Sequence, residues 1–408
     1  MGDSAPAVLS NGLPMKVLSP LLAAPTYAKA RLALGISGVG TFVVLSIIAA
    51  AARLPHRIFE EKDGGLFTDA SLLAVWLAAV ALLTLPFEAL GGYFLPKRHG
   101  RRHLEGGDWA VSWLRGALVV TLTMSLSGAL VILGGTYAGR IGAIGMLGLV
   151  VVSLAGLQGW IARLVGGLRV VRPELGALED ELRTMGFIVP EIVVFDSEDE
   201  GFTGGIVGLP TAEKIVLPLR WVATLETKSL AVLVARRSTL VDRGMRAMGL
   251  GGAMAWTLVA FGLATYLPGA GVAGVAELLT TSLWFTVLSF MGLLFLPTPS
   301  RAAAIAADAF VVENDEDRKC ALIAALQSLD RFADDEPERT EQVERIFHPV
   351  PSLGSRRRAL ENPITEVAPW HLARTAIFLS IAALNPLSRL VHCNAGRPDL
   401  WIFLPADG

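Results

Sequence analysis

The chain has 408 residues, of which 53% are hydrophobic, and its mean hydropathy is +0.54. Charged residues make up only 18%, against about 25% in ordinary soluble domains, so the composition excludes an ordinary soluble enzyme. The 35 Lys and Arg nearly balance the 37 Asp and Glu, which gives no overall attraction to nucleic acid. Two cysteines are too few for a disulfide framework. We therefore expect a mostly α-helical, polytopic membrane protein that contacts the lipid bilayer and does not bind nucleic acid.

Six apolar stretches are each long enough to cross a bilayer, for which a helix needs about 20 mostly apolar residues. They cover residues 32–52, 71–90, 116–135, 141–162, 247–267 and 278–297. Strands are excluded there, because an open sheet in lipid would leave backbone groups unpaired. Lys and Arg gather before the first stretch and after the second and fourth. This bias predicts that both termini and both large polar segments are cytoplasmic.

The spans divide the chain into five parts. These are a cytoplasmic N-terminal segment (1–31), four transmembrane helices (32–164), the first part of a small α+β domain (165–246), two transmembrane helices (247–297) and the second part of that domain with a C-terminal tail (298–408). The two polar parts together provide enough chain for one domain. Within them we expect helices at 173–185 and 224–246, strands at 188–195 and 214–217, and a long helix from about Ser300.

The tail contains a mixed apolar and basic stretch at 370–390 that Pro386 interrupts. It is too short for a confident seventh span, so an interfacial helix or a helix packed on the domain is expected. The end, Trp401-Ile402-Phe403-Leu404, is expected to be a docking strand or an apolar anchor.

Common catalytic motifs are missing from the sequence. It contains no H-E-x-x-H, no Walker loop, no G-x-S-x-G and no paired C-x-x-C. Four weaker fragments occur in a fixed order. They are Phe202–Gly205 after a predicted strand, the helical stretch SLAVLVARRSTLVDRG, the stretch SRAAAIAAD from Ser300 to Asp308, and His348-Pro349 with Arg356 downstream.

This order resembles the HtpX-like membrane zinc metallopeptidases, which are relatives of the CAAX prenyl protease. The resemblance covers about residues 173–360 and the general plan of spans, and it implies a zincin-like domain. The positions that match the family's zinc histidines are Arg236 and Leu240, its general-base glutamate matches Arg237, and its third ligand matches Ala304. Zinc needs three protein donors and an open position for water, and none of these side chains is a donor for zinc. We therefore expect no catalytic residues, no metal and no cofactor.

Two interpretations remain open for the two arginines. Arg236 and Arg237 either face solvent, or at least one lies in the former metal pocket and pairs with Asp308, since a buried Arg demands a partner. The segment Phe202-Thr203-Gly204-Gly205 either forms an exposed edge that binds peptide by strand addition or is a covered edge.

The sequence thus favours a catalytically inactive, HtpX-like membrane pseudopeptidase that acts as a binding, scaffold or assembly subunit. Its partners would be other membrane proteins or a protein segment. The alternative is a membrane-bound zinc metalloendopeptidase with non-standard ligands. His348 is the only histidine in the matched region, and it lies at the family's H-P rather than on the metal helix.

Overall fold

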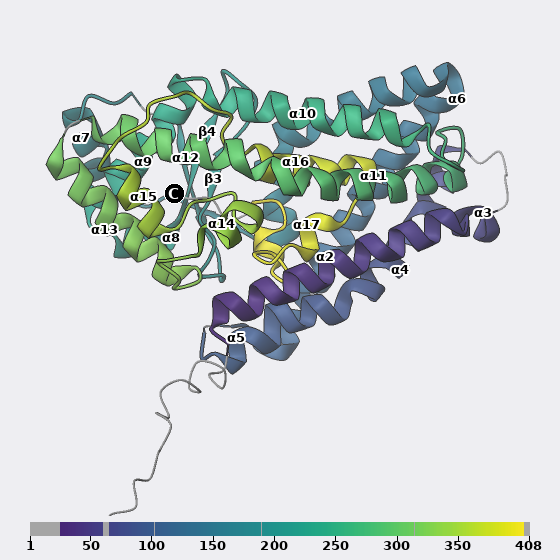
Figure 1. The fold of residues 1–408 in the computed structure, drawn as a ribbon, viewed down its shortest axis with the longest axis horizontal. Helices are drawn as coiled ribbons and strands as arrows, with labels where there is room; N and C mark the ends of the chain where they lie inside the picture. Colours follow the sequence, from purple (N-terminus) through teal and green to yellow (C-terminus); the bar gives the residue numbers. More distant parts are fainter. Residues whose placement is uncertain (1–24, 60–64, 102, 189, 314, 404–408) are drawn as a thin grey trace, which may run out of the picture.

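The computed structural model describes residues 25–59, 65–101, 103–188, 190–313 and 315–403. Long helices form an elongated bundle, and shorter helices with a small sheet form one end of the molecule (Figure 1). The described residues contain five helical segments that are long and apolar enough to cross a membrane. They are α2 (Tyr27–Ala51), α4 (Leu66–Ala89, continued by η1, Leu90–Phe94, and α5, Leu95–Arg98), α6 (Gly106–Gly166), α10 (Met245–Ala264) and α11 (Val275–Phe295).

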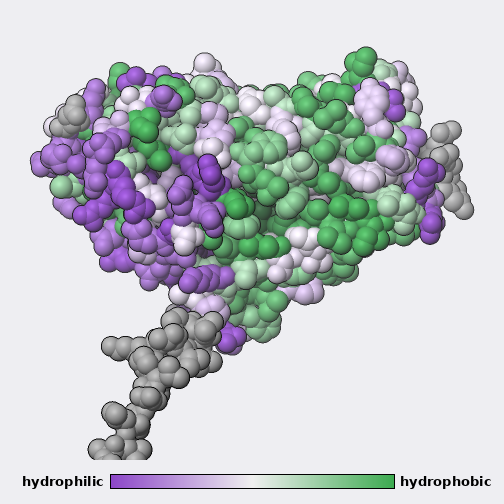
Figure 2. Space-filling model, viewed as in Figure 1, coloured by the Kyte–Doolittle hydropathy of each residue, from purple (hydrophilic) through white to green (hydrophobic). Residues whose placement is uncertain are grey.

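The outer surface of these helices is apolar. Large side chains such as Val44, Leu82 and Leu126 are more than half exposed to the surroundings, which is the arrangement that lipid favours and water does not. Figure 2 shows this apolar region over the long helices and a hydrophilic end over the shorter ones. The structure therefore supports an integral, multi-pass membrane protein.

The helix α6 carries two of the six predicted spans, because it folds back on itself. Ala138 and Gly139 leave the helical conformation, and Gly139 has φ +60°, a region that glycine adopts easily. A Cβ on Gly134 would lie 2.6 Å from the carbonyl oxygen of Gly142. In a straight helix eight residues rise by about 12 Å, so the two arms form a hairpin.

The small sheet has the strand order β1-β2-β4-β3. Its strands are β1 (Arg169–Val171), β2 (Ile192–Asp196), β3 (Gly205–Val207) and β4 (Lys214–Pro218). The two predicted strands correspond to β2 and β4, which pair in parallel, and the two shorter strands pair antiparallel at the edges. The helices of this end are α7 (Gly176–Thr184), α8 (Leu219–Thr224), α9 (Thr227–Asp242), α12 (Pro297–Val312), α13 (Glu316–Phe332), α14 (Glu341–Phe347) and α15 (Leu353–Ala359).

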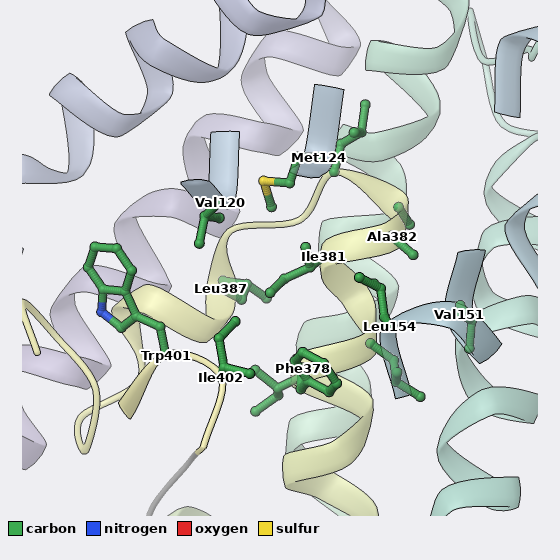
Figure 3. Packing of buried hydrophobic residues seen from close by; sticks show 14 of the residues in the cluster. Val120, Met124, Val151, Leu154, Phe378, Ile381, Ala382, Leu387, Trp401 and Ile402 are labelled. Atoms are coloured by element: carbon green, nitrogen blue, oxygen red, sulfur yellow. The ribbon is translucent and has the colours of Figure 1, made fainter. Parts of the chain in front are cut away.

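The C-terminal tail lies inside the helix bundle, not at its surface. It forms α16 (Leu372–Leu379), η2 (Ser380–Ala383), α17 (Leu387–Leu390) and η3 (Pro398–Leu400). Figure 3 shows Phe378, Ile381 and Leu387 packed near Val120 and Leu154 of the two α6 arms. An interfacial helix was therefore the wrong expectation, because nearly every residue from 370 to 403 is buried. Trp401, Ile402 and Phe403 are buried anchors, and Leu404 lies outside the described residues.

Candidate functional site

The helices α9 and α12 cross where the sequence resemblance aligns the zinc helix with the acidic helix. Arg236 on α9 and Asp308 on α12 are both buried, at 0% and 1% exposure. The Nε of Arg236 donates to Oδ1 of Asp308 at 2.5 Å, and a terminal nitrogen of Arg236 donates to the carbonyl oxygen of Ala304 at 3.0 Å. The structure thus brings these two predicted residues together in an ion pair.

A second guanidinium group binds the same carboxylate. Arg356, on α15, donates through Nε to Oδ2 of Asp308 and through a terminal nitrogen to Oδ1, both at 2.6 Å. Arg356 is 4% exposed. One carboxylate therefore holds two arginines from two different helices, and the cluster Arg236–Asp308–Arg356 has a formal charge of one positive unit.

Arg237 turns toward the sheet. Its two terminal nitrogens donate to the carbonyl oxygens of Val216, on β4, and Thr203, before β3, each at 2.7 Å. Its guanidinium carbon also lies 5.0 Å from the centre of the Trp221 ring, within cation–π range. The two adjacent arginines have different partners, because successive side chains on a helix point about 100° apart. Arg237 ties α9 to the sheet, while Arg236 ties α9 to α12.

The other two positions aligned with zinc ligands are closed by packing. Leu240 is completely buried and lies in one apolar cluster with Ala303 and Ala307 of α12. Ala304 contributes its backbone carbonyl to Arg236. Among the described residues, no three His, Cys, Asp or Glu side chains are grouped so that they could hold a metal ion. Because Arg236 and Arg356 are cations, the donor set around Asp308 does not fit zinc.

The proposed peptide-binding edge is covered. All four residues, Phe202, Thr203, Gly204 and Gly205, are buried. The rings of Phe202 and Phe403 meet edge to face with centroids 5.7 Å apart, and a Cβ on Gly205 would lie 3.7 Å from the ring of Phe403. The last described residues of the chain therefore lie against β3, so that any peptide would have to displace them.

His348, from the H-P pair of the sequence motif, faces His392 of the C-terminal tail. Their ring centroids lie 4.9 Å apart. The backbone carbonyl of His392 accepts two hydrogen bonds from Arg31 at 3.0 and 3.1 Å, and Arg31 also pairs with Asp334 at 2.5 Å. Burial, and then the neighbouring imidazole, lower the pKa of His348 to about 2. Burial, and then Arg31, lower the pKa of His392 to about 3.

These two histidines predict a loss of stability in acid. Both stay neutral in the folded chain, while in the unfolded chain each titrates near 6.5. Since only the unfolded state takes up protons below that value, stability should fall as the pH drops from about 6.5 toward 3, by up to about 1.4 kcal/mol per pH unit for each group. Melting temperatures measured between pH 8 and 4 should therefore decline less steeply for His348→Phe. A control variant at the exposed His103, His103→Phe, should keep the wild-type slope, and equal slopes in all three proteins would contradict the assignment.

Three functional features escaped the sequence analysis. The sequence places Arg356, the second cation on Asp308, in the C-terminal motif and does not predict its partner. The contact of His392 with His348 joins residues that no sequence spacing connects. Glu88, which the apolar pattern places near the end of a span, is fully buried and paired with Arg389. One indication of this pair is present in the sequence: Glu88 is a charged residue in an apolar stretch, and such a residue needs a partner.

Comparison with known proteins finds similarity to solved structures. No family model matches the chain, and a sequence search of curated proteins finds no relative. The solved structure of S. mikatae Ste24p is similar with a TM-score of 0.60 and 15% sequence identity, over 79% of this chain and 80% of that chain. Likeness at this identity concerns the fold. The chain therefore has a Ste24p-like fold, which agrees with the mostly helical, multi-pass membrane architecture expected from the sequence.

Proposed function

We propose that this chain is a catalytically inactive membrane relative of the HtpX-like peptidases and of Ste24p, a CAAX prenyl protease. In this proposal it works as a binding, scaffold or assembly subunit, with its polar end and both termini in the cytoplasm. The observation that carries the proposal is the buried cluster Arg236–Asp308–Arg356. It occupies the crossing of α9 and α12, where the sequence resemblance puts the zinc ligands.

The cluster can hold helices together, as a structural metal ion would. A zinc ion joins helices by accepting electron pairs from their side chains. Here Asp308 joins α12 to α9 through Arg236 and to α15 through Arg356. Charge-assisted, partly bidentate bonds of this kind have fixed geometry. These helices can thus stay packed together without a metal, and Arg236, Asp308 and Arg356 would not activate water as a zinc ion does.

The proposal predicts that purified protein carries far less than one zinc per chain. A chelator should leave its melting temperature unchanged, and casein or a peptide substrate should not be cleaved. Elemental analysis by mass spectrometry, together with melting curves, measures the first two. Stoichiometric zinc together with a melt that a chelator lowers and zinc restores would overturn the proposal and favour the metalloendopeptidase with non-standard ligands.

A restored variant tests the position of the former site. Arg236→His, Arg237→Glu, Leu240→His and Ala304→Glu, combined, should gain measurable zinc affinity. A matched variant with Arg236→Asn, Arg237→Gln, Leu240→Phe and Ala304→Gln has similar side-chain volumes without the ligands, and it should bind no zinc. If both folded variants bind zinc equally, or neither does, then the alignment with the zinc helix is wrong.

A further inference from the structure

Two cavities meet between the membrane-spanning helices and the polar end of the molecule. The first, the apolar cavity, has a volume of about 360 Å³, within the range of about 300–1,000 Å³ typical of ligand pockets. Most of its wall comes from apolar side chains on α2, α11, α14 and α16: Leu32, Ile36, Val39, Phe290, Leu293, Leu294, Ile346, Phe347, Ala373 and Ile377. The helices α2 and α11 diverge toward the polar end of the molecule, and the C-terminal tail lies between them (Figure 1).

The mouth of the apolar cavity opens on the lipid-facing surface. Ile36, Leu294 and Ile346 are 45%, 48% and 41% exposed, and they come from three different elements. These exposed apolar side chains leave the mouth of the cavity open to lipid, as on the rest of the apolar surface. Figure 2 shows that the apolar region of the surface meets the hydrophilic end directly. A lipid chain in the bilayer can therefore enter sideways.

The second cavity, the polar cavity, has a volume of about 110 Å³ and adjoins the first. Arg374, His392 and Cys393 line both. The segment from Phe347 to Pro349 borders both, since Phe347 and Pro349 line the apolar cavity and His348 lines the polar one. The polar cavity is thus at the inner end of the apolar cavity.

The polar cavity suits an anion. Its wall contains five arginines, Arg31, Arg339, Arg356, Arg374 and Arg397, against two aspartates, Asp330 and Asp334. Arg31 pairs with Asp334, Arg339 with Glu336 and Arg397 with Asp199. Arg356 shares the carboxylate of Asp308 with Arg236. His348 is only 6% exposed, and its buried Nε2 makes no hydrogen bond within the described chain. A buried polar atom without a partner carries an energetic cost that a ligand can remove.

We propose that the two cavities together bind one anionic phospholipid, with an acyl chain in the apolar cavity and the headgroup phosphate in the polar cavity. The apolar cavity gives the acyl chain apolar surroundings like those of the bilayer, so the chain loses little free energy when it moves from the bilayer into the cavity. Arg374 and His348 provide charge and hydrogen bonding to the phosphate, as guanidinium groups commonly do. The site is separate from the former metal position, so it does not depend on the proposed loss of catalysis.

Gly40 offers a variant that blocks the site without disturbing the fold. It lines the apolar cavity, and a Cβ built on it meets no atom within 4 Å. Gly40→Leu therefore puts a side chain into the cavity. The matched control is Gly145→Leu on α6, where a Cβ also meets nothing within 4 Å and which lines neither of these two cavities. The variant His348→Phe tests the headgroup end, because it keeps an aromatic ring and removes both ring nitrogens.

Native mass spectrometry of the purified chain, titrated with phosphatidylglycerol or phosphatidylcholine, measures the affinity. We expect one phosphatidylglycerol per chain, bound at least tenfold more tightly than phosphatidylcholine. Gly40→Leu should weaken it at least tenfold, His348→Phe should weaken it severalfold, and Gly145→Leu should leave it unchanged. Equal binding by the wild type and Gly40→Leu overturns the proposal, as does equal affinity for the two lipids. Competition by millimolar inorganic phosphate alone would show a free-anion site and overturn the lipid assignment.

Discussion

Asp308→Ala is expected to lower the free energy of unfolding by about 3–5 kcal/mol, because removing one member of a buried ion pair leaves the other charge uncompensated. Here two guanidinium groups, those of Arg236 and Arg356, would lose their carboxylate at once. Both are buried, so water cannot replace it. The measurement is denaturant-induced or thermal unfolding of the purified protein in detergent, compared with the wild type.

Two further variants separate the cluster from a general effect of losing a carboxylate. Asp317, whose side chain is 84% exposed, pairs with Lys228 at 3.3 Å. Asp317→Ala should cost only about 0–1 kcal/mol, as exposed pairs do. Adding Arg236→Met to Asp308→Ala should recover part of the loss, since an apolar side chain in place of the buried cation needs no partner. A silent Asp308→Ala would show that the cluster does not hold the helices together.

Glu88→Ala is expected to destabilise the protein by a similar amount, again about 3–5 kcal/mol. The Glu88 carboxylate is completely buried and receives hydrogen bonds from Arg389 at 3.0 Å, Trp113 at 2.5 Å and Thr84 at 2.9 Å. Arg389 belongs to the C-terminal tail, and its guanidinium carbon also lies 4.5 Å from the centre of the Trp401 ring. This ion pair therefore ties the tail to α4 inside the bundle. Unfolding in detergent, with limited proteolysis of the tail, measures the effect.

A double-mutant cycle distinguishes the ion pair from packing. Glu88→Leu combined with Arg389→Met replaces both charges by apolar groups of similar volume, and the pair of changes should cost much less than Glu88→Ala alone. Protease cleavage within the tail should increase in Glu88→Ala and stay near the wild-type rate in the double variant. Independent, additive effects of the two single changes would show that the pairing contributes nothing.

Apolar composition was the most informative part of the sequence. Runs of about 20 apolar residues can be satisfied only by helices in lipid, so the location of each long helix follows from local sequence. The two runs on either side of Gly139 are the two arms of α6, as predicted. The sequence does not show how sharply the chain reverses between them, which depends on Ala138 and Gly139 leaving the helical conformation.

The candidate site was partly visible from the residues. A helix that carries Arg236 and Arg237 beside apolar neighbours, and an Asp308 next to small residues, left an ion pair as one of two interpretations, and the structure brings Arg236 and Asp308 together. The sequence could not predict that Arg236 pairs with Asp308 while Arg237 contacts the sheet. That division depends on which face of α9 meets α12, and packing decides it.

Local sequence therefore determined the membrane class, the places of the long helices, the two central strands and the absence of a zinc motif. Only the tertiary structure decided that the tail from Trp370 to Phe403 lies inside the bundle, that Arg356 joins Asp308 and that Glu88 meets Arg389. Each of these contacts joins residues 48 to 301 positions apart along the chain or buries a segment against distant helices. The short-range periodicity of the sequence cannot predict contacts between residues so far apart along the chain. In the folded protein these buried polar groups need hydrogen-bond partners, and packing decides which groups are near enough to pair.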